Sequence, residues 1–188
     1  MLARNLFSIM WMAWALYWLV LSRNVKATTR EEPRASRLAH VLPLLLAGFL
    51  LAAPRMPIAA LDTRFLVYGP WQYWTGAALC AAGLLFSVWA RRHIGRNWSG
   101  IVTLKQDHEL ITSGPYAIVR HPIYTGLLLA FVGTAVVRGD LRGVLAVIIA
   151  FAALWRKLRF EEGWMREQFG PAYTAYSARV AALVPFIL

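Results

Sequence analysis

Residues able to hold a charged ligand are concentrated in two stretches of the second half of the chain. The first, 95–124, reads GRNWSGIVTLKQDHELITSGPYAIVRHPIY, and the second, 155–176, reads WRKLRFEEGWMREQFGPAYTAY. Both combine carboxylates with aromatic side chains. A carboxylate pairs with a cation, and the face of an aromatic ring attracts one. The two stretches therefore predict a site for a cationic ligand or cofactor.

The turn residues of the first stretch predict where its second histidine lies. Ser-Gly-Pro at 113–115 indicates a turn, and Pro122 disfavours helical backbone at His121. We therefore expect His121 and Tyr124 at the entrance of the helix that follows. A ligand at that position can meet both water and lipid.

Two other kinds of site are not favoured by the sequence. His93, His108 and His121 lack the close spacing of metal ligands, so no metal site is expected. The glycine-containing stretch 95–100, GRNWSG, does not follow a strand pattern. A Rossmann-type cofactor site, which needs a strand before its glycines, is therefore not supported.

The adjacent glutamates Glu161 and Glu162 have two interpretations. On a helix, each lies one turn from a basic residue, Lys157 or Arg166, and such i,i+4 pairs are common on solvated faces. Alternatively, a glutamate faces the site and binds the ligand. We expect one glutamate to do each, and the sequence leaves open which one.

The composition indicates a membrane protein. Of 188 residues, 59% are hydrophobic and 15% are charged, and the mean hydropathy is +0.51, whereas a soluble domain is about half apolar and a quarter charged. An ordinary soluble enzyme, a disordered chain and a disulfide scaffold are thereby excluded, the last because Cys80 is alone. The net charge of +11 does not favour nucleic acid, because the basic residues lie between apolar runs.

Five apolar stretches predict five transmembrane helices in a single all-α domain, 1–188, with two spans in 1–60 and the catalytic part in 71–188. A span needs about 20 apolar residues, so the first and third stretches pass readily. The second stretch is short and contains Pro43. The fourth and fifth stretches are expected to form a tight helical hairpin. The second helix of this hairpin continues to Phe160 and beyond, and a cytoplasmic helix follows it. The stretches are 5–21, 38–53, 71–90, 123–137 and 143–155.

The basic residues predict the orientation of these spans. Segments 22–37, 91–122 and 156–188 carry 15 lysines and arginines, and the alternate segments carry 5. Cytoplasmic loops are enriched in these residues. We therefore expect the N-terminus outside, and the C-terminus and the candidate site in the cytoplasm.

Several motifs of the second half occur together in one order. They are ELITSGPYAIVRHPIYTG at 109–126, Glu161-Glu162, Phe169-Gly170, Tyr173, Tyr176 and RVAALVPFI at 179–187. In order and spacing this set resembles the isoprenylcysteine carboxyl methyltransferase family and its bacterial relatives. The resemblance implies an integral membrane methyltransferase, here of a bacterial inner membrane, that uses S-adenosylmethionine and releases S-adenosylhomocysteine.

The resemblance also implies which residues form the site. Eukaryotic members carry an arginine near the substrate carboxylate, a short distance before the glutamate. The matching position here is Lys157, with Arg156 and Arg159 nearby. The resemblance therefore implies Lys157, Arg159 and Glu161 as the catalytic residues. Lysine lacks the planar fork of arginine. The implied cofactor contacts are His108, Glu109, Leu110, Ile111, Tyr116, His121, Pro122, Ile123, Tyr124 and one of Glu161 and Glu162.

The methyl acceptor is left open by the sequence. An amphiphilic or lipid-like molecule that enters from the bilayer is expected, with a prenylcysteine-like carboxylate as the first candidate and a thiol, an amine or a phospholipid headgroup as alternatives. A membrane carrier without enzymatic activity is less favoured. A transporter places polar residues at mid-membrane, and the spans offer little beyond Ser87, Thr125 and Thr134.

Overall fold

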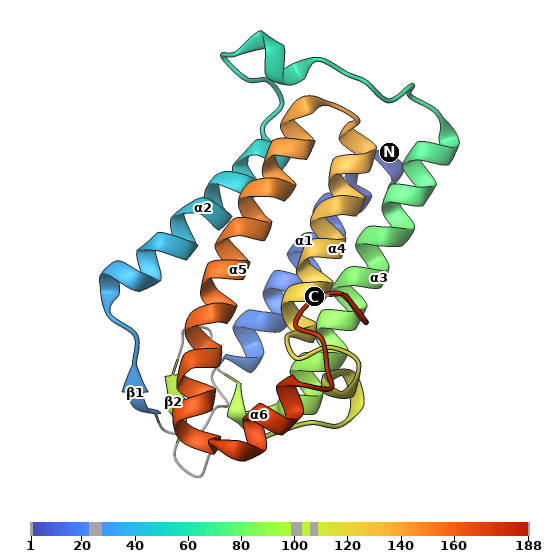
Figure 1. Cartoon of the computed structure of the whole chain (residues 1–188). Helices are drawn as coiled ribbons and strands as arrows, with labels where there is room; N and C mark the ends of the chain where they lie inside the picture. Colours follow the sequence, from blue (N-terminus) through green and yellow to red (C-terminus); the bar gives the residue numbers. More distant parts are fainter. Residues whose placement is uncertain (1, 23–27, 99–102, 106–108, 188) are drawn as a thin grey trace.

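The computed structural model describes residues 2–22, 28–98, 103–105 and 109–187. Within these residues the chain is a bundle of helices, and the expected all-α class is confirmed (Figure 1). The α-helices are α1 (Leu2–Leu21), α2 (Arg34–Ala52), α3 (Pro70–Ile94), α4 (Pro122–Arg138), α5 (Leu141–Phe169) and α6 (Pro171–Ser177). Short 3-10 turns lie at Ala59–Asp62, Gly95–Asn97 and Gly114–Ala117.

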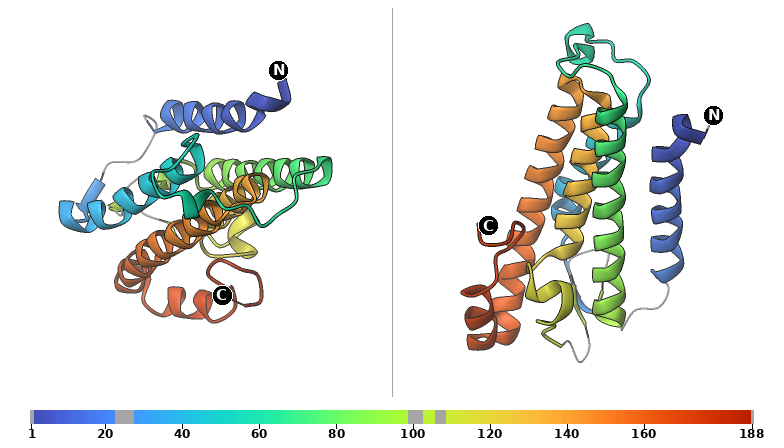
Figure 2. Two further views of the ribbon diagram at one scale, coloured as in Figure 1. Left: turned by 90° about the horizontal axis from the view of Figure 1, so that it is seen from above. Right: turned by 90° about the vertical axis from the view of Figure 1, so that its right-hand side faces the viewer.

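Helices α3 and α4 lie side by side at the centre of the bundle (Figure 2). Their facing surfaces carry glycines. A Cβ atom added at Gly83 would collide with the carbonyl oxygen of Gly126, and one added at Gly133 would collide with the backbone of Cys80. Small residues let two helix backbones approach closely. This close packing fixes the position at which α4 begins.

Helices α4 and α5 form the tight hairpin that the sequence predicts. Only Gly139 and Asp140 separate them. Gly139 adopts the left-handed conformation, with φ of 63°, which glycine tolerates without strain. Asp140 caps α5 by accepting a hydrogen bond from the N–H of Gly143 at 2.9 Å. Because α5 continues beyond its apolar part to Phe169, its last turns form a polar extension.

Among the described residues, two helices are long and apolar enough to cross a membrane, by length and composition: Arg34–Ala52, with mean hydropathy 1.7, and Pro70–Asn97, with 1.4. The apolar helices Asn5–Leu21 and Pro122–Arg138 are shorter. The third stretch therefore has the length expected of a span, and α1 (Leu2–Leu21) has the 20 residues that a span needs. The second is longer than expected because α2 begins before its apolar stretch and continues through Pro43.

At the end of the bundle formed by the α4–α5 turn, two arginines bind the last turn of α2. Arg142 is 1% exposed, donates a hydrogen bond to the carbonyl oxygen of Ala53 at 2.8 Å and lies 3.2 Å from a carboxylate oxygen of Asp62. Arg138 donates to the carbonyl oxygen of Leu51 at 2.9 Å. Cations satisfy the free carbonyls of a helix C-terminus and are favoured by its dipole. These contacts fasten α2 to the hairpin.

The opposite end of the bundle gathers the polar segments. Figure 1 shows α6, the end of α3 and the start of α4 there. The strands β1 (Thr28–Glu31) and β2 (Thr103–Lys105) also lie there and pair antiparallel, a small sheet that the sequence did not indicate. The described parts of the three segments rich in lysine and arginine therefore meet at one end.

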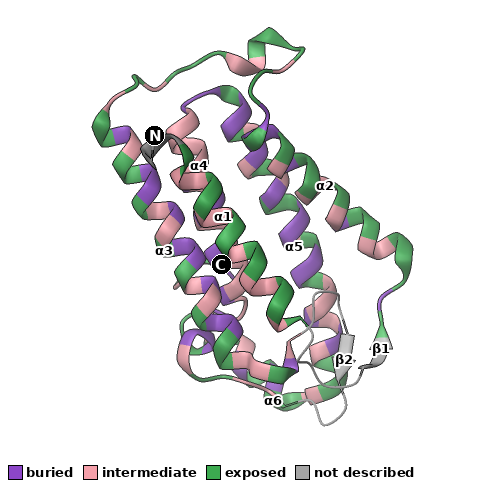
Figure 3. Ribbon diagram, turned by 180° about the vertical axis from the view of Figure 1, so that it is seen from behind, coloured by how far each residue is buried: buried purple, intermediate pink, exposed green. Residues whose placement is uncertain are grey.

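Helix α1 is the most peripheral of the long helices. It packs against α3, and Figure 3 shows that its surface is exposed or half-buried along its length. Two of its tryptophans nevertheless reach inward: Trp14 donates to the hydroxyl of Ser87 at 2.8 Å, and Trp11 donates to the hydroxyl of Thr134 at 3.2 Å. These bonds fix the rotation of α1 about its axis.

Candidate functional site

The entrance of α4 is held in place by the C-terminal segment of the chain. The backbone N–H of Arg120 donates to the carbonyl oxygen of Ala181 at 2.8 Å, and that of His121 donates to Ala182 at 3.0 Å. Pro122 is the first residue of α4, and the backbone at His121 is not helical, with φ of −122° and ψ of 62°. His121 therefore lies at the helix entrance, as its sequence context predicts.

Glu162 organises the packing around this entrance. One of its carboxylate oxygens accepts hydrogen bonds from Arg120, at 2.8 and 2.6 Å, and lies 3.3 Å from Nε2 of His121, while the other accepts from Arg166 at 3.0 Å. Burial opposes ionisation of this carboxyl group, but its bonds with His121 and Arg120 outweigh burial and lower its pKa to about 2. Glu162 is 1% exposed and ties α5 to the start of α4.

The carboxylate of Glu161 is turned toward Tyr124 and Lys157. Its carboxylate accepts a hydrogen bond from the hydroxyl of Tyr124 at 2.5 Å and lies 3.5 Å from Nδ1 of His121 and 3.9 Å from Nζ of Lys157. Burial raises the pKa of Glu161, but the His121 bond and the Lys157 charge outweigh burial, so that the net shift is downward. This site thus contains a second ionised carboxylate.

His121 lies between the two carboxylates and stacks on the ring of Tyr124, with ring centroids 5.5 Å apart and an interplanar angle of 4°. Burial disfavours the imidazolium, but the hydrogen bonds and charges of Glu161 and Glu162 outweigh burial and raise the pKa of His121. His121 therefore connects the entrance of α4 to both glutamates.

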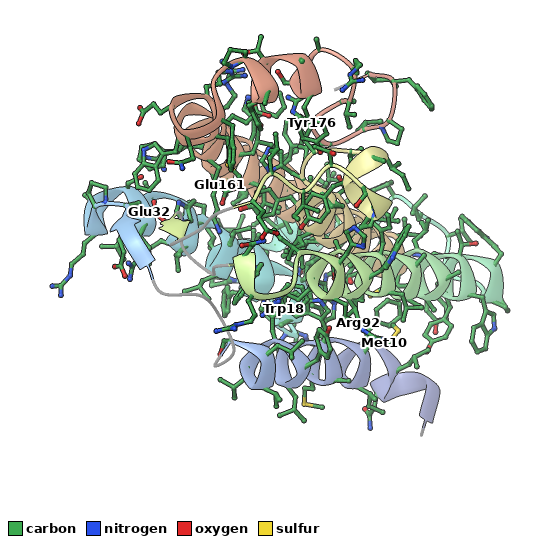
Figure 4. The ribbon with its side chains drawn as sticks, turned by 90° about the horizontal axis from the view of Figure 1, so that it is seen from below. Met10, Trp18, Glu32, Arg92, Glu161 and Tyr176 are labelled. Carbon is green, nitrogen blue, oxygen red and sulfur yellow. The ribbon has the colours of Figure 1, made fainter. Side chains whose placement is uncertain are left out.

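A cavity of about 340 Å³ opens beside Glu161, a volume in the range of small-molecule pockets. Figure 4 views this end from below and labels Trp18, Glu161 and Tyr176, all of which line the cavity. Arg120 and Lys157 line it as well. Of the expected cofactor contacts, those that line it are Glu109, Leu110, Ile111, Tyr116, His121, Pro122, Ile123, Tyr124 and Glu161.

Two expected site residues of the described chain, Glu162 and Arg159, do not line the cavity, and a third lies outside the described residues. Glu162 is not among the lining residues, because its carboxylate is turned toward Arg120 and Arg166. Arg159 is exposed and does not line the cavity. His108 lies outside the described residues.

The segment that carries Tyr116 is fixed by the end of α3 and by α6. His93 lies 2.9 Å from the hydroxyl of Ser113 and stacks near the ring of Tyr116. Gly114 has φ of 59°, and a Cβ atom there would lie 2.7 Å from the His93 ring, so this turn requires glycine. The hydroxyl of Tyr176 donates to the carbonyl oxygen of Tyr116 at 2.6 Å.

Part of the cavity wall comes from residues that the sequence analysis did not select. Trp18 of α1 and Leu44 of α2 line it, with Leu127 and Leu154 from the hairpin. An apolar side chain within a span has the same sequence signature whether it faces lipid or a cavity, so no signal distinguished these residues. Arg120 was also missed, although its position directly before His121 was the available signal.

The arrangement suits a cationic ligand with an aromatic or apolar part. The Glu161 carboxylate, four tyrosines and three tryptophans line one partly buried cavity, and each of these groups attracts or tolerates a cation. Among the residues that the structure describes, no three histidine, cysteine, aspartate or glutamate side chains gather as a metal site requires.

Fold and site together define an apolar helical protein with a cavity of charged and aromatic side chains at one end. The sequence profile of the phospholipid methyltransferase family matches residues 71–172, from α3 to α6, and the chain belongs to this family. The family consists of S-adenosylmethionine-dependent membrane methyltransferases, and the resemblance to isoprenylcysteine methyltransferases is confirmed.

Curated relatives share part of the chain. Protein-S-isoprenylcysteine O-methyltransferase B of Arabidopsis thaliana is 33% identical over 99 residues, which are 50% of this chain and 49% of the relative. A probable protein-S-isoprenylcysteine O-methyltransferase of Oryza sativa subsp. indica is 31% identical over 126 residues, 62% of this chain and 64% of the relative. The cobalt-zinc-cadmium resistance protein CzcN of Cupriavidus metallidurans is 29% identical over 114 residues, which are 60% of this chain and 51% of the relative. The chain thus spans about half to two thirds of these relatives.

Proposed function

We propose that this protein is a membrane-embedded methyltransferase that transfers the methyl group of S-adenosylmethionine to an amphiphilic acceptor. The observation that carries the proposal is that nine of the residues expected to contact the cofactor line one cavity, although they come from separate segments of the chain. The family and its relatives support the same activity. The carboxylate and the aromatic rings of the cavity fit a sulfonium compound with an amino group.

The bound cofactor supplies a methyl group whose bond to sulfur breaks as the acceptor's lone pair forms a new bond to carbon, and sulfur keeps the electron pair. The protein's part is to align the two reactants and to exclude water. We assign Glu161 to hold the cationic part of the cofactor, with residues 109–111, Tyr116 and residues 121–124 around it. Glu162 acts as a positioning residue, because it holds Arg120 and His121 rather than the cavity.

Lys157 is assigned to the acceptor. Its ammonium lies 3.9 Å from Glu161 and 5.3 Å from the centre of the Tyr124 ring, at the cavity wall. A lysine there attracts an anionic group, so a carboxylate of the prenylcysteine kind is the favoured acceptor. Arg159, which is exposed outside the cavity, is not assigned a role in the reaction.

We further propose that α1 to α4 and the first part of α5 cross the membrane in a single domain, with the cavity on the cytoplasmic side of a bacterial inner membrane. The cavity lies at the end that gathers the basic segments, as a cytoplasmic face requires. Leu44, Leu127 and Leu154 give the cavity an apolar wall. This wall supports entry of the acceptor's tail from the bilayer.

Two measurements on purified protein in nanodiscs test the proposal. Calorimetry should show binding of S-adenosylhomocysteine, and absence of binding would overturn the cofactor assignment. Methyl-labelled S-adenosylmethionine should then label N-acetyl-S-farnesylcysteine in preference to phosphatidylethanolamine vesicles and to a tailed thiol. Labelling of the phospholipid or of the thiol instead would overturn the assignment of a carboxylate acceptor. If none of the three is labelled, the protein binds the cofactor without transferase activity and the proposed function is wrong.

A further inference from the structure

A buried acid and imidazole lie outside the part of the chain that the family profile matches. Glu32, just before α2, and His40, in the second turn of α2, have side chains that are 0% and 2% exposed. A carboxylate oxygen of Glu32 lies 3.4 Å from Nε2 of His40. Neither residue lines the cavity or belongs to the assigned site.

His40 of this pair lies on α2, which packs along α5, the helix that carries Lys157. One turn before His40, Ser36 accepts a hydrogen bond from Arg156 at 3.1 Å through its carbonyl oxygen. One turn after His40, Leu44 lines the cavity. Helix α2 packs along α5, so this face of α2 is turned toward the segment of α5 that carries Lys157.

Electrostatic interactions connect the pair to the residues of the wall. The charges of Lys157, Arg156 and Glu161 act on the His40 ring. The charge of Glu32 also acts on Tyr124, whose ring lies beneath the Lys157 ammonium. The described chain thus couples a buried imidazole electrostatically to a lysine that is itself only 8% exposed.

Burial of such groups is costly and calls for a compensating role. An acid and an imidazole removed from water lose hydration free energy that is regained only through partners. Neither ring nitrogen of His40 has a hydrogen-bond partner among the described residues, so the 3.4 Å contact with Glu32 is an electrostatic one. A pair of well-packed apolar side chains at these two places would join α2 to α5 without that cost.

We propose that Glu32 and His40 form a positioning pair that fixes the place of the Lys157 ammonium at the cavity wall and so sets the affinity for the acceptor's polar group. The inference rests on the proposed function in one respect, the assignment of Lys157 to the acceptor. It gives the N-terminal helices a part in substrate selection, since neither residue lies within the matched range 71–172.

A spectroscopic experiment tests the pair without any acceptor. The chain has three lysines, Lys26, Lys105 and Lys157, so ¹³C-dimethylation of the protein in nanodiscs gives few NMR signals. The signal of Lys157 is the one that is lost in Lys157→Arg. His40→Gln and Glu32→Gln should each move this signal and leave the other two unchanged. Ser36→Ala, on the same helix face and beside Arg156, is the matched control and should leave all three unchanged.

Steady-state kinetics of single and double variants test whether the Glu32–His40 pair sets the affinity for the acceptor. With N-acetyl-S-farnesylcysteine, or whichever tested acceptor is labelled, His40→Gln and Glu32→Gln should raise KM about tenfold and leave binding of S-adenosylhomocysteine within twofold. In a Lys157→Ala background neither change should have a further effect. Glu32→Asp should restore part of the affinity.

Two results would overturn the proposal. One is a Lys157 signal that does not move in either variant while both remain folded, as judged by retained binding of S-adenosylhomocysteine. The other is an additive loss in the Lys157→Ala background, which would assign the pair to helix packing alone. If no acceptor is methylated at all, the proposed function fails, whereas the Lys157 signal still decides whether the pair positions this side chain.

Discussion

Glu161 and Glu162 are neighbours in the sequence and serve different surfaces of the protein. Successive residues of a helix point about 100° apart, so when Glu162 faces Arg120 and Arg166, Glu161 is turned toward the cavity. The sequence predicts that the two differ and does not predict which faces the site. The rotation of α5 that decides this is fixed by packing against α2 and α4.

The two glutamates should therefore respond differently to the same change. Glu161→Gln should weaken binding of S-adenosylhomocysteine by about 1–3 kcal/mol, because a cationic ligand loses its charged partner, and should leave the melting temperature nearly unchanged. Glu162→Gln should lower the free energy of unfolding by about 3–5 kcal/mol, because Arg120 loses the carboxylate that neutralises it. Calorimetry and thermal melting in the same nanodiscs measure both.

The pH dependence of stability provides a control for Glu162. Its pKa in the folded protein is about 2, below the ordinary 4.5, so its contribution is complete above pH 4.5 and is lost as the pH falls from 4.5 toward 2. The difference in melting temperature between wild type and Glu162→Gln should shrink across that window. A difference independent of pH would show that the carboxylate charge does not stabilise the fold.

Lys157 offers a third residue-scale prediction. Lys157→Ala should raise the acceptor's KM or lower kcat and leave cofactor affinity nearly unchanged, because the ammonium lies beside Tyr124 on the acceptor side. Lys157→Arg should retain activity on a carboxylate acceptor, since arginine binds that group with two parallel bonds. Steady-state kinetics and calorimetry separate the two effects. Equal losses of cofactor binding and turnover would instead mean that Lys157 positions Glu161.

At the scale of helices and turns, local signals predicted what they directly determine. Pro122 placed the entrance of α4, and the short polar stretch 138–142 placed the turn of the hairpin. The contributions of Trp18 and Leu44 to the cavity were not predictable, because they depend on how α1 and α2 are rotated and tilted against the other helices. The Glu32–His40 pair escaped notice for the same reason, since a polar side chain at a span's edge normally faces water.

The α2–hairpin connection carries a prediction about stability. Arg142→Leu should lower the free energy of unfolding by about 3–5 kcal/mol, because it leaves the carbonyl oxygen of Ala53 and the carboxylate of Asp62 without their buried partner. Binding of S-adenosylhomocysteine by the folded fraction should be unaffected, since this contact is at the end opposite the cavity. Arg55→Ala, at an exposed arginine of the same connection, is the control and should be neutral. Thermal melting and calorimetry measure both quantities.

The orientation of the whole molecule is tested from its two ends. In a Cys80→Ser background, a cysteine introduced at Ala60, in the exposed α2–α3 connection, should react with an impermeant reagent added to intact cells, because that end carries few basic residues. A cysteine introduced at Ala178, exposed after α6, should react only after the membrane is opened. Reaction at Ala178 in intact cells would place the cavity on the outer face.

Cavity and membrane together predict how the acceptor's tail contributes to affinity. Trp18, Leu44 and Leu154 come from three different helices and give the cavity an apolar side, so each methylene of a tail that packs there should add up to about 0.8 kcal/mol until the available length is filled. KM measured for a series of S-alkylcysteine derivatives of increasing chain length should fall and then level off. Leu44→Ala should flatten this dependence, and Leu16→Ala, at an exposed position of α1, should not. Equal turnover of tailed and tailless acceptors would show that the substrate arrives from water and that the apolar wall serves only the cofactor.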